Sequence, residues 1–271
     1  MASFSPDCTV LVTSCDRYRD IDGPFICLWR RYWPDCPFET VLLTESEFPA
    51  EGEFGGSFDR VIAVGPGKTW SETVVEALGM ISTPYVILQM NDFIPDSKVN
   101  TARMLALLEV AKRLDALEFR LIPKPSAKGP VVAAPEVPGA EVHSFPKNRA
   151  YSASCQTGYW NREFLMALAR RTKSAWEFER YGSYMFDVGD RRPVLMTAAQ
   201  EFPCIDTVHK GYWEPEGVAL LKREGIGYDF SRRGLPPFWP RLKSNLKKAV
   251  FAVFPWELVV RVQNVFNLGM K

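Results

Sequence analysis

The sequence contains few of the residues that build metal centres and disulfide frameworks. Its 271 residues include two histidines, His143 and His209, and six cysteines with no Cys-x-x-Cys pair among them. Zinc sites of the common structural kinds need such close pairs, so their absence excludes that class. We interpret the six cysteines as reduced thiols in a cytosolic protein.

Excess charge and long apolar runs are also missing. Lysine and arginine (33) nearly balance aspartate and glutamate (32), which gives a net charge of +1 and no argument for a nucleic-acid partner. No stretch reaches the ~18 apolar residues of a transmembrane helix. The first seven residues lack the positive start and apolar run of a secretory signal. We therefore expect a cytoplasmic protein.

Two phosphate-binding motifs are absent as well. The sequence has no Gly-x-Gly-x-x-Gly and no complete Gly-x-x-x-x-Gly-Lys-Ser/Thr loop. These motifs bring backbone N–H groups against phosphates in dinucleotide enzymes and P-loop proteins. Both classes are disfavoured, so any nucleotide site must be built from side chains, with or without a metal.

The first ninety residues nevertheless read as a nucleotide-binding type of half-domain. Short β-branched or apolar runs predict strands at 9–13, 39–44, 59–64 and 85–90, and helical spacing predicts helices at 25–33 and 70–81. Such alternation is typical of an α/β fold with a mostly parallel sheet flanked by helices. We predict one α/β domain over residues 1–235.

The second half continues the pattern less regularly. We predict helices at 100–114, 162–171 and 216–224, a strand at 118–122 and a strand-like run at 203–209. The Pro-, Gly- and Ala-rich stretch 123–146 is interpreted as a long loop. It either covers an active site or is a surface loop with no such role.

Polar residues follow two of the predicted strands directly. Thr13, Ser14 and Asp16 follow the first strand, and Asn91 and Asp92 follow the strand at 85–90. Ligands of open α/β sheets bind outside the carboxyl ends of the strands, where an oxygen ligand can hold a divalent cation and a diphosphate. The alternatives are that Asp16 caps a helix and that Asn91 and Asp92 start a turn.

Two later segments carry candidate chemistry. Glu177 and Glu179 lie in an aromatic-rich stretch, where one buried carboxylate would serve as a general base; the alternative is a solvated helix face. His209 and Lys210 precede a glycine, a combination that suits a phosphate group. A lone histidine is otherwise more often structural.

Five pieces in order resemble bacterial glycosyltransferases of the GT-A fold, of the kind found in capsule and lipopolysaccharide gene clusters. The pieces are Thr13-Ser-Cys-Asp16, Tyr85-Val-Ile-Leu-Gln-Met-Asn-Asp-Phe93, Gln156-Thr-Gly-Tyr-Trp-Asn-Arg-Glu163, Trp176-Glu-Phe-Glu179 and His209-Lys-Gly211. The resemblance covers about residues 8–234. It implies a Rossmann-type, GT-A-like sheet and a nucleotide-sugar donor, with a UDP-sugar in first place.

The resemblance also implies a metal and a set of donor-binding residues. In that fold an Asp-x-Asp motif binds Mn²⁺ or Mg²⁺, which bridges the diphosphate, and a late histidine assists. The matching metal ligands here are Asp92 and His209, although the motif keeps only one central carboxylate. The donor-binding residues implied are Thr13, Ser14, Asp16, Asn91, Asp92, His209 and Lys210.

The reaction implied is displacement at the anomeric carbon of the donor sugar. We expect inversion, with Glu179 as the first choice of general base and Glu177 as the second. The acceptor would be a glycan or lipid-linked hydroxyl in surface polysaccharide synthesis. Two alternatives stay open: a sugar nucleotidyltransferase, disfavoured because residues 14–18 lack glycine, and a non-catalytic carbohydrate-binding or assembly protein on the same fold.

The C-terminal residues 236–271 form a separate, basic segment. Apolar residues recur there at helical spacing, and residues 241–271 hold six basic residues and one acidic residue, Glu257. This pattern suits an amphipathic helix on an anionic membrane surface, which would make the protein peripheral to the cytoplasmic membrane. The alternative is a helix that packs on the domain or on a second copy.

Overall fold

The computed structural model describes residues 4–47, 57–124, 129–148, 151–187 and 189–234. The strands of its main sheet are β1 Cys8–Thr13, β2 Glu39–Thr44, β3 Arg60–Ala63, β4 Tyr85–Met90, β6 Glu118–Arg120, β7 Val131–Val132, β8 Val142–Phe145, β9 Gly158–Asn161 and β10 Val194–Thr197. The helices are α1 Arg19–Tyr32, α2 Trp70–Gly79, α3 Thr101–Arg113, α4 Arg162–Ala169, α5 Ala175–Arg180 and α6 Pro215–Arg223. Two strand pairs stand apart: β5 Phe93–Pro95 with β11 Cys204–Asp206, and β12 Val208–His209 with β13 Tyr212–Trp213.

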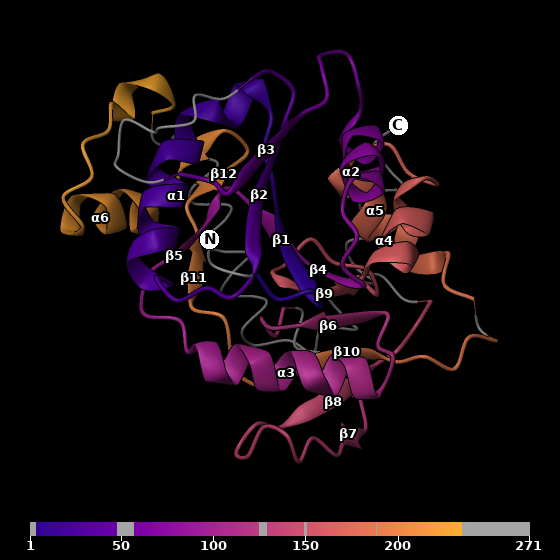
Figure 1. Ribbon diagram of the computed structural model, residues 1–271. Coiled ribbons are helices and arrows are strands. Elements are labelled where there is room, and N and C mark those ends of the chain that lie inside the picture. The colour runs from indigo at the N-terminus through magenta and orange to yellow at the C-terminus, as the bar shows by residue number, and fades with distance from the viewer. Residues whose placement is uncertain (1–3, 48–56, 125–128, 149–150, 188, 235–271) are drawn as a thin grey trace, which may run out of the picture.

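The main sheet has nine strands in the order β3-β2-β1-β4-β9-β6-β10-β8-β7 (Figure 1). The pairings between neighbours give β3, β2, β1, β4, β6, β10 and β7 one direction, whereas β9 and β8 run the opposite way. The predicted class is therefore confirmed: a mostly parallel, Rossmann-type central sheet flanked by helices.

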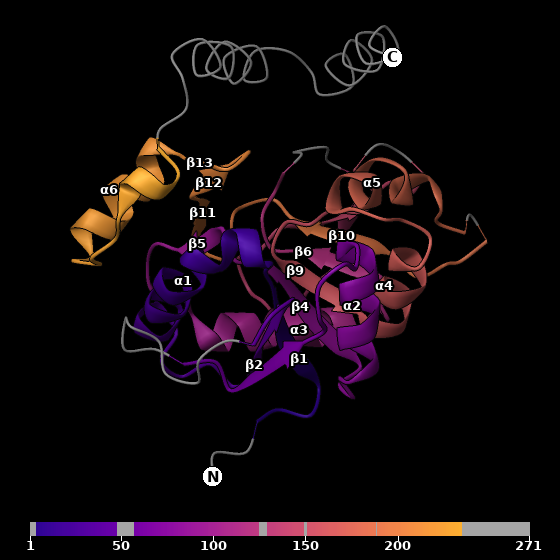
Figure 2. The same cartoon turned by 90° about the horizontal axis from the view of Figure 1, so that it is seen from above.

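Helices cover both faces of this sheet (Figures 1 and 2). Along β1, Val10 and Val12 belong to a core cluster shared with α1, α3 and α6, whereas Leu11 belongs to a second cluster shared with α2, α4 and α5. All six β1 residues are buried. Strands buried on both faces read as continuous apolar runs, which is why the sequence signal for β1 is strong.

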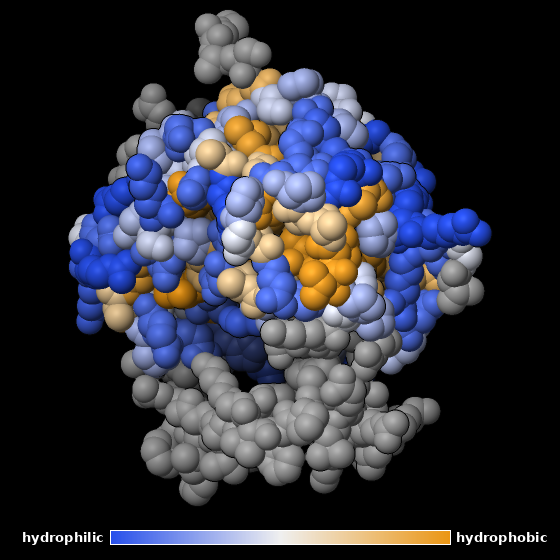
Figure 3. Space-filling view, turned by 90° about the horizontal axis from the view of Figure 1, so that it is seen from below, coloured by the Kyte–Doolittle hydropathy of each residue, from blue (hydrophilic) through white to orange (hydrophobic). Residues whose placement is uncertain are grey.

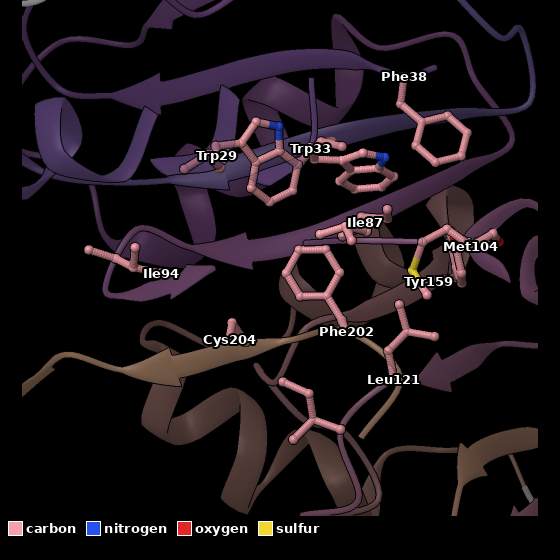
Figure 4. Packing of buried hydrophobic residues seen from close by; sticks show 14 of the residues in the cluster. Trp29, Trp33, Phe38, Ile87, Ile94, Met104, Leu121, Tyr159, Phe202 and Cys204 are labelled. Atoms are coloured by element: carbon pink, nitrogen blue, oxygen red, sulfur yellow. Dashed lines mark hydrogen bonds between the residues drawn. The ribbon is translucent and has the colours of Figure 1, made fainter. Parts of the chain in front are cut away.

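Aromatic side chains fix helix α1 against the rest of the core (Figure 4). The ring of Phe202 lies 5.6 Å from that of Trp29 and 5.8 Å from that of Trp33. Trp33 Nε1 also donates a 2.8 Å hydrogen bond to Thr101 Oγ1, which ties α1 to the start of α3. Because α1 is held in this way, the segment between β1 and α1 has a fixed place at the edge of the sheet.

The prediction of a structureless loop at 123–146 was wrong. Within the described part of that stretch, β7 and β8 extend the sheet, and Thr197 of β10 pairs with Val142 of β8. Strand β10 was not predicted either. Tertiary pairing decides the conformation of such short segments more than their own propensity does. Thr69 caps α2, where it forms a capping box with Glu72.

The predicted basic segment 236–271 lies outside the described residues, so its helical and membrane-binding character stays a prediction. Among the described residues, no helix combines the length and apolar character needed to cross a bilayer. The face seen in Figure 3 is mainly hydrophilic around a hydrophobic patch near its centre.

Candidate active site

A cavity of about 680 Å³ opens where β1 and β4 end. Its volume is in the range of small-molecule and cofactor sites. It is lined by Thr13, Ser14, Cys15, Arg17, Tyr18, Glu45, Lys68, Trp70, Thr73, Met90, Asn91, Asp92, Phe93, Cys155, Gln156, Ala175, Trp176, Glu179, Asp206, Val208, His209 and Lys210. The carboxyl ends of parallel strands therefore meet helix α5 and the β12–β13 hairpin around one hollow.

The structure brings most of the predicted site residues to this cavity. Those that line it are Thr13, Ser14, Asn91, Asp92, Glu179, His209 and Lys210. The two that do not line it are Asp16 and Glu177. Residues from four distant parts of the sequence thus converge, although their roles in binding and catalysis stay predictions.

Asp16 has a different set of contacts from the one predicted. Its Oδ1 accepts a 3.1 Å hydrogen bond from Ser46 N, and its own backbone N–H donates to Glu45 Oε2 at 2.9 Å. The hydroxyl of Ser46 donates to Asp16 Oδ2 at 2.5 Å. Asp16 therefore ties the segment after β1 to the end of β2, beside the cavity wall.

Asn91 holds the carboxyl ends of β1 and β4 together. Its Nδ2 donates to Asp22 Oδ1 at 2.7 Å, to Ser14 Oγ at 3.0 Å and to the backbone oxygen of Tyr18 at 3.1 Å. Ser14 Oγ donates in turn to Asp22 Oδ2 at 3.0 Å. Burial raises the pKa of Asp22 to about 7, against the effect of these hydrogen bonds. Asp22, which the sequence analysis did not select, is thus the acceptor at the centre of this network.

Asp92 sits where β4 passes into β5. The backbone N–H and the hydroxyl of Thr207 both donate to the backbone oxygen of Asp92 at 2.8 Å. Its side-chain Oδ1 is buried and has no hydrogen-bond partner among the described residues. Burial, and next the negative charge of Asp206, raise the pKa of Asp92 to about 8. A cation or a hydroxyl donor at this carboxyl would relieve both effects.

The residues around Asp92 fit a divalent cation in one particular way. Asp92, Asp206 and His209 all line the cavity, but the described residues contain no cluster of three His, Cys, Asp or Glu arranged to hold a metal ion. Mg²⁺ is usually bound by one or two carboxylates together with substrate phosphates. The site therefore suits a cation that arrives with a diphosphate, and not one held by protein ligands alone.

His209 and Lys210 are presented by a tight hairpin. Lys210 and Gly211 form the two-residue turn between β12 and β13, with φ of 52° and 85°. Two positive φ values are what a type I′ turn requires. Lys210 is exposed at its tip, so the hairpin supplies a cation and an imidazole to the cavity opposite β1.

Glu179 is the acidic group on the α5 side. Its Oε1 accepts a 2.8 Å hydrogen bond from Cys155 N and a 3.3 Å bond from Ser154 Oγ. Burial raises the pKa of Glu179 above the ordinary value, and these hydrogen bonds and the charge of Arg120 only partly oppose it. Glu177 instead uses Oε2 to accept a 2.9 Å bond from Lys173 N outside the cavity lining. The structure therefore separates the first choice of general base from the second, because Glu179 lines the cavity and Glu177 does not.

A buried ion pair lies behind Glu179. Arg120 and Glu118 have fully buried side chains, joined at 2.7 Å, and Arg120 Nη2 donates to the backbone oxygen of Ser152 at 2.8 Å. The pair thus helps to fix the segment that donates Cys155 N–H to Glu179. The strand at 118–122 was predicted, but nothing in its apolar pattern marks this role.

The chain matches no family model and no curated protein sequence. Several solved structures are similar to parts of it. The 2-C-methyl-D-erythritol 4-phosphate cytidylyltransferase of Thermus thermophilus is 16% identical, with a TM-score of 0.44 over 82% of this chain and 100% of that one. A cytidylyltransferase of Leptospira borgpetersenii is 10% identical, with a TM-score of 0.40 over 81% and 95%. Residues 1–349 of S. aureus TarS are 13% identical, with a TM-score of 0.41 over 73% and 59%. At these values the likeness carries no argument about activity.

Proposed function

We propose that this chain is a glycosyltransferase that moves a sugar from a nucleoside diphosphate donor, UDP in first place, to an acceptor hydroxyl. The observation that supports this most is the composition of one cavity at the carboxyl ends of β1 and β4. A half-buried carboxylate with a raised pKa, Glu179, lines it together with Asp92, His209 and Lys210. Glu179 is suited to take a proton from an acceptor hydroxyl. The other three side chains are suited to bind a diphosphate, directly or through a cation.

The donor would lie between β1 and the hairpin. Thr13 and Ser14 line the cavity at the end of β1 and would contact the nucleoside. His209 and Lys210 would donate hydrogen bonds to the diphosphate. Asp92 and His209, with Asp206 beside them in the lining, would hold Mn²⁺ or Mg²⁺ next to the diphosphate, and the cation would neutralise charge there when bound.

In the proposed reaction the acceptor oxygen attacks the anomeric carbon of the donor sugar. Glu179 takes the hydroxyl proton as the new carbon–oxygen bond forms. The bond between the anomeric carbon and the phosphate oxygen breaks, and the nucleoside diphosphate leaves with the electron pair. Lys210 and His209 stabilise the charge that develops on it. Attack from the face opposite the leaving group inverts the configuration.

The base role of Glu179 is tested with a matched pair of variants. We expect Glu179→Gln to lose turnover and keep donor binding, whereas Glu177→Gln keeps both, because only Glu179 lines the cavity. Wild-type turnover should fall on acidification through a pKa above the ordinary glutamate range, since the base must be ionised. Full activity of Glu179→Gln would remove this residue from the mechanism.

Donor class and metal dependence are tested by thermal shift with UDP, GDP, CMP and TDP, each with and without Mn²⁺. A ligand that binds only the folded state raises its stability according to RT ln(1 + [L]/Kd). We expect one diphosphate to raise Tm, more strongly with Mn²⁺, and Asp92→Asn to abolish the extra shift. The absence of any shift would contradict the proposed function.

We also propose that the acceptor is a glycan or lipid-linked glycan of surface polysaccharide synthesis, reached through the basic segment 236–271. The support is the composition of that segment. Co-sedimentation with anionic vesicles should be lost when the chain is truncated after Gly234. Unchanged binding would refute the membrane role and leave the reaction untouched.

A further inference from the structure

Trp176 is unlike the other tryptophans in the described part of the chain. Trp29, Trp33, Trp160 and Trp213 are fully buried and Trp70 is half-buried, whereas 61% of the Trp176 surface is exposed. Trp176 also lines the cavity. A large aromatic side chain left in water at the wall of a cavity is a recognisable feature of binding sites, because its burial by a ligand is favourable.

The position of Trp176 is coupled to that of Glu179. The two residues lie three apart on helix α5, so they share one side of the helix. Between them, Phe178 is fully buried, with its ring 5.5 Å from that of Trp70 and 5.4 Å from that of Trp160. Phe178 therefore anchors α5 while Trp176 and Glu179 both reach the cavity lining.

The side chains of the cavity wall around Trp176 indicate the chemistry of the ligand. An indole ring offers a flat, electron-rich face that attracts weakly positive C–H groups. Beside it, Glu179 and Gln156 offer polar atoms to the same hollow. A ligand that contacts both the indole face and these polar atoms needs an apolar C–H face and hydroxyls around its edge. A pyranose ring has both features. An acyl chain has no hydroxyls for the carboxylate.

We propose that Trp176 is the stacking platform of an acceptor subsite and that the acceptor is a carbohydrate. The C–H face of one pyranose ring lies on the indole, and a hydroxyl of that ring points at the Glu179 carboxylate. This inference rests on the proposed function. It goes further because it places the acceptor sugar on a named residue and gives that residue a role in acceptor specificity.

The test is saturation-transfer NMR on the full chain loaded with UDP, with methyl glycosides of glucose, galactose and N-acetylglucosamine as probes. We expect one glycoside to receive saturation mainly at the ring protons of a single face. Trp176→Ala should weaken its binding about tenfold or more, as expected for one lost aromatic contact, and Trp176→Phe should retain most of it.

Tyr184→Ala is the matched control, because Tyr184 is 54% exposed but does not line the cavity. We expect its binding to equal that of the wild type, and the UDP thermal shift to be the same in all variants. Unchanged glycoside binding by Trp176→Ala would overturn the inference. Binding of no glycoside by a protein that still binds UDP would also overturn it, while leaving the donor half of the proposed function intact. If the wild type does not bind UDP, the result would instead count against the proposed function itself.

Discussion

The substitution Asp22→Asn should remove a pH dependence of folding that the structure assigns to one side chain. Asp22 is fully buried and accepts hydrogen bonds from Asn91 and Ser14. Its pKa is raised from 3.8 to about 7 by burial. Between these two values the unfolded chain carries a charge on Asp22 that the folded chain does not carry. Stability therefore falls as pH rises through this window.

The size of the change in the free energy of unfolding follows from the pKa shift of Asp22. One pKa unit corresponds to about 1.36 kcal/mol, so a shift of about three units costs the wild type about 4 kcal/mol once Asp22 is fully ionised above its folded pKa. Asparagine has nearly the same shape and no charge. Its oxygen can accept from Asn91 and its amide can donate to Ser14 Oγ, so the variant should match the wild type within about 1 kcal/mol at pH 4.

The assay is urea unfolding of both proteins at intervals from pH 4 to pH 8. We expect the variant to gain about 4 kcal/mol relative to the wild type across this range. Asp20→Asn is the control. Burial opposes ionisation of Asp20, but hydrogen bonds from Arg233 and Tyr228 outweigh it and lower its pKa below 3.8. The stability that Asp20 contributes is therefore lost only below about pH 4, and the difference between Asp20→Asn and the wild type should stay nearly constant from pH 4 to pH 8. A constant difference between Asp22→Asn and the wild type would refute the reasoning.

Other substitutions have effects that urea unfolding at one pH can measure. Gly158→Ala should lower the free energy of unfolding by about 1–3 kcal/mol, because a Cβ there would lie 2.8 Å from the backbone oxygen of Phe119. Gly79→Ala is the control: a Cβ there has no atom within 4 Å, so this substitution should be neutral or stabilising by up to about 1 kcal/mol. Equal effects of the two substitutions would contradict the steric argument. Thr69→Ala should cost about 1 kcal/mol through loss of the capping box. Phe202→Ala should cost about 3–5 kcal/mol because its buried ring packs on α1, and a cost below about 1 kcal/mol would show that the aromatic cluster collapses to fill the space.

The strands that were predicted well are those with an uninterrupted apolar run in their middle. β2 and β4 begin and end as predicted, and β1 begins one residue earlier, because burial on both faces leaves a continuous apolar run in the sequence. β8 contains His143 and Ser144 and is a strand because it pairs with β10. Pairing across about 50 residues of sequence leaves no local pattern that propensity can detect.

The residues of the candidate site also differ in whether the sequence alone could place them. Residues directly after a predicted strand, such as Ser14 and Asn91, could be placed at one sheet edge from the sequence. Asp22 could not, because its importance depends on Asn91, 69 residues further along the chain. The resemblance ranked Glu179 above Glu177, but the local residue pattern could not, because the hydrogen bond to Glu179 comes from the backbone N–H of Cys155 elsewhere in the chain.

Arg233, near the end of the described chain, packs behind Tyr18, a residue of the cavity lining. Its Nε donates to Asp20 Oδ2 at 2.8 Å, and its guanidinium lies 4.4 Å above the ring of Tyr18. A ribosome adding about 5–20 residues per second needs about 10–40 s to travel from Asp20 to Arg233. For most of that interval the nascent chain contains the residues of β1 but lacks the hairpin that lines the cavity and the arginine that packs on Tyr18. The proposed nucleotide binding should therefore appear only after residue 233 has been added, and a stalled chain ending before residue 206 should have none.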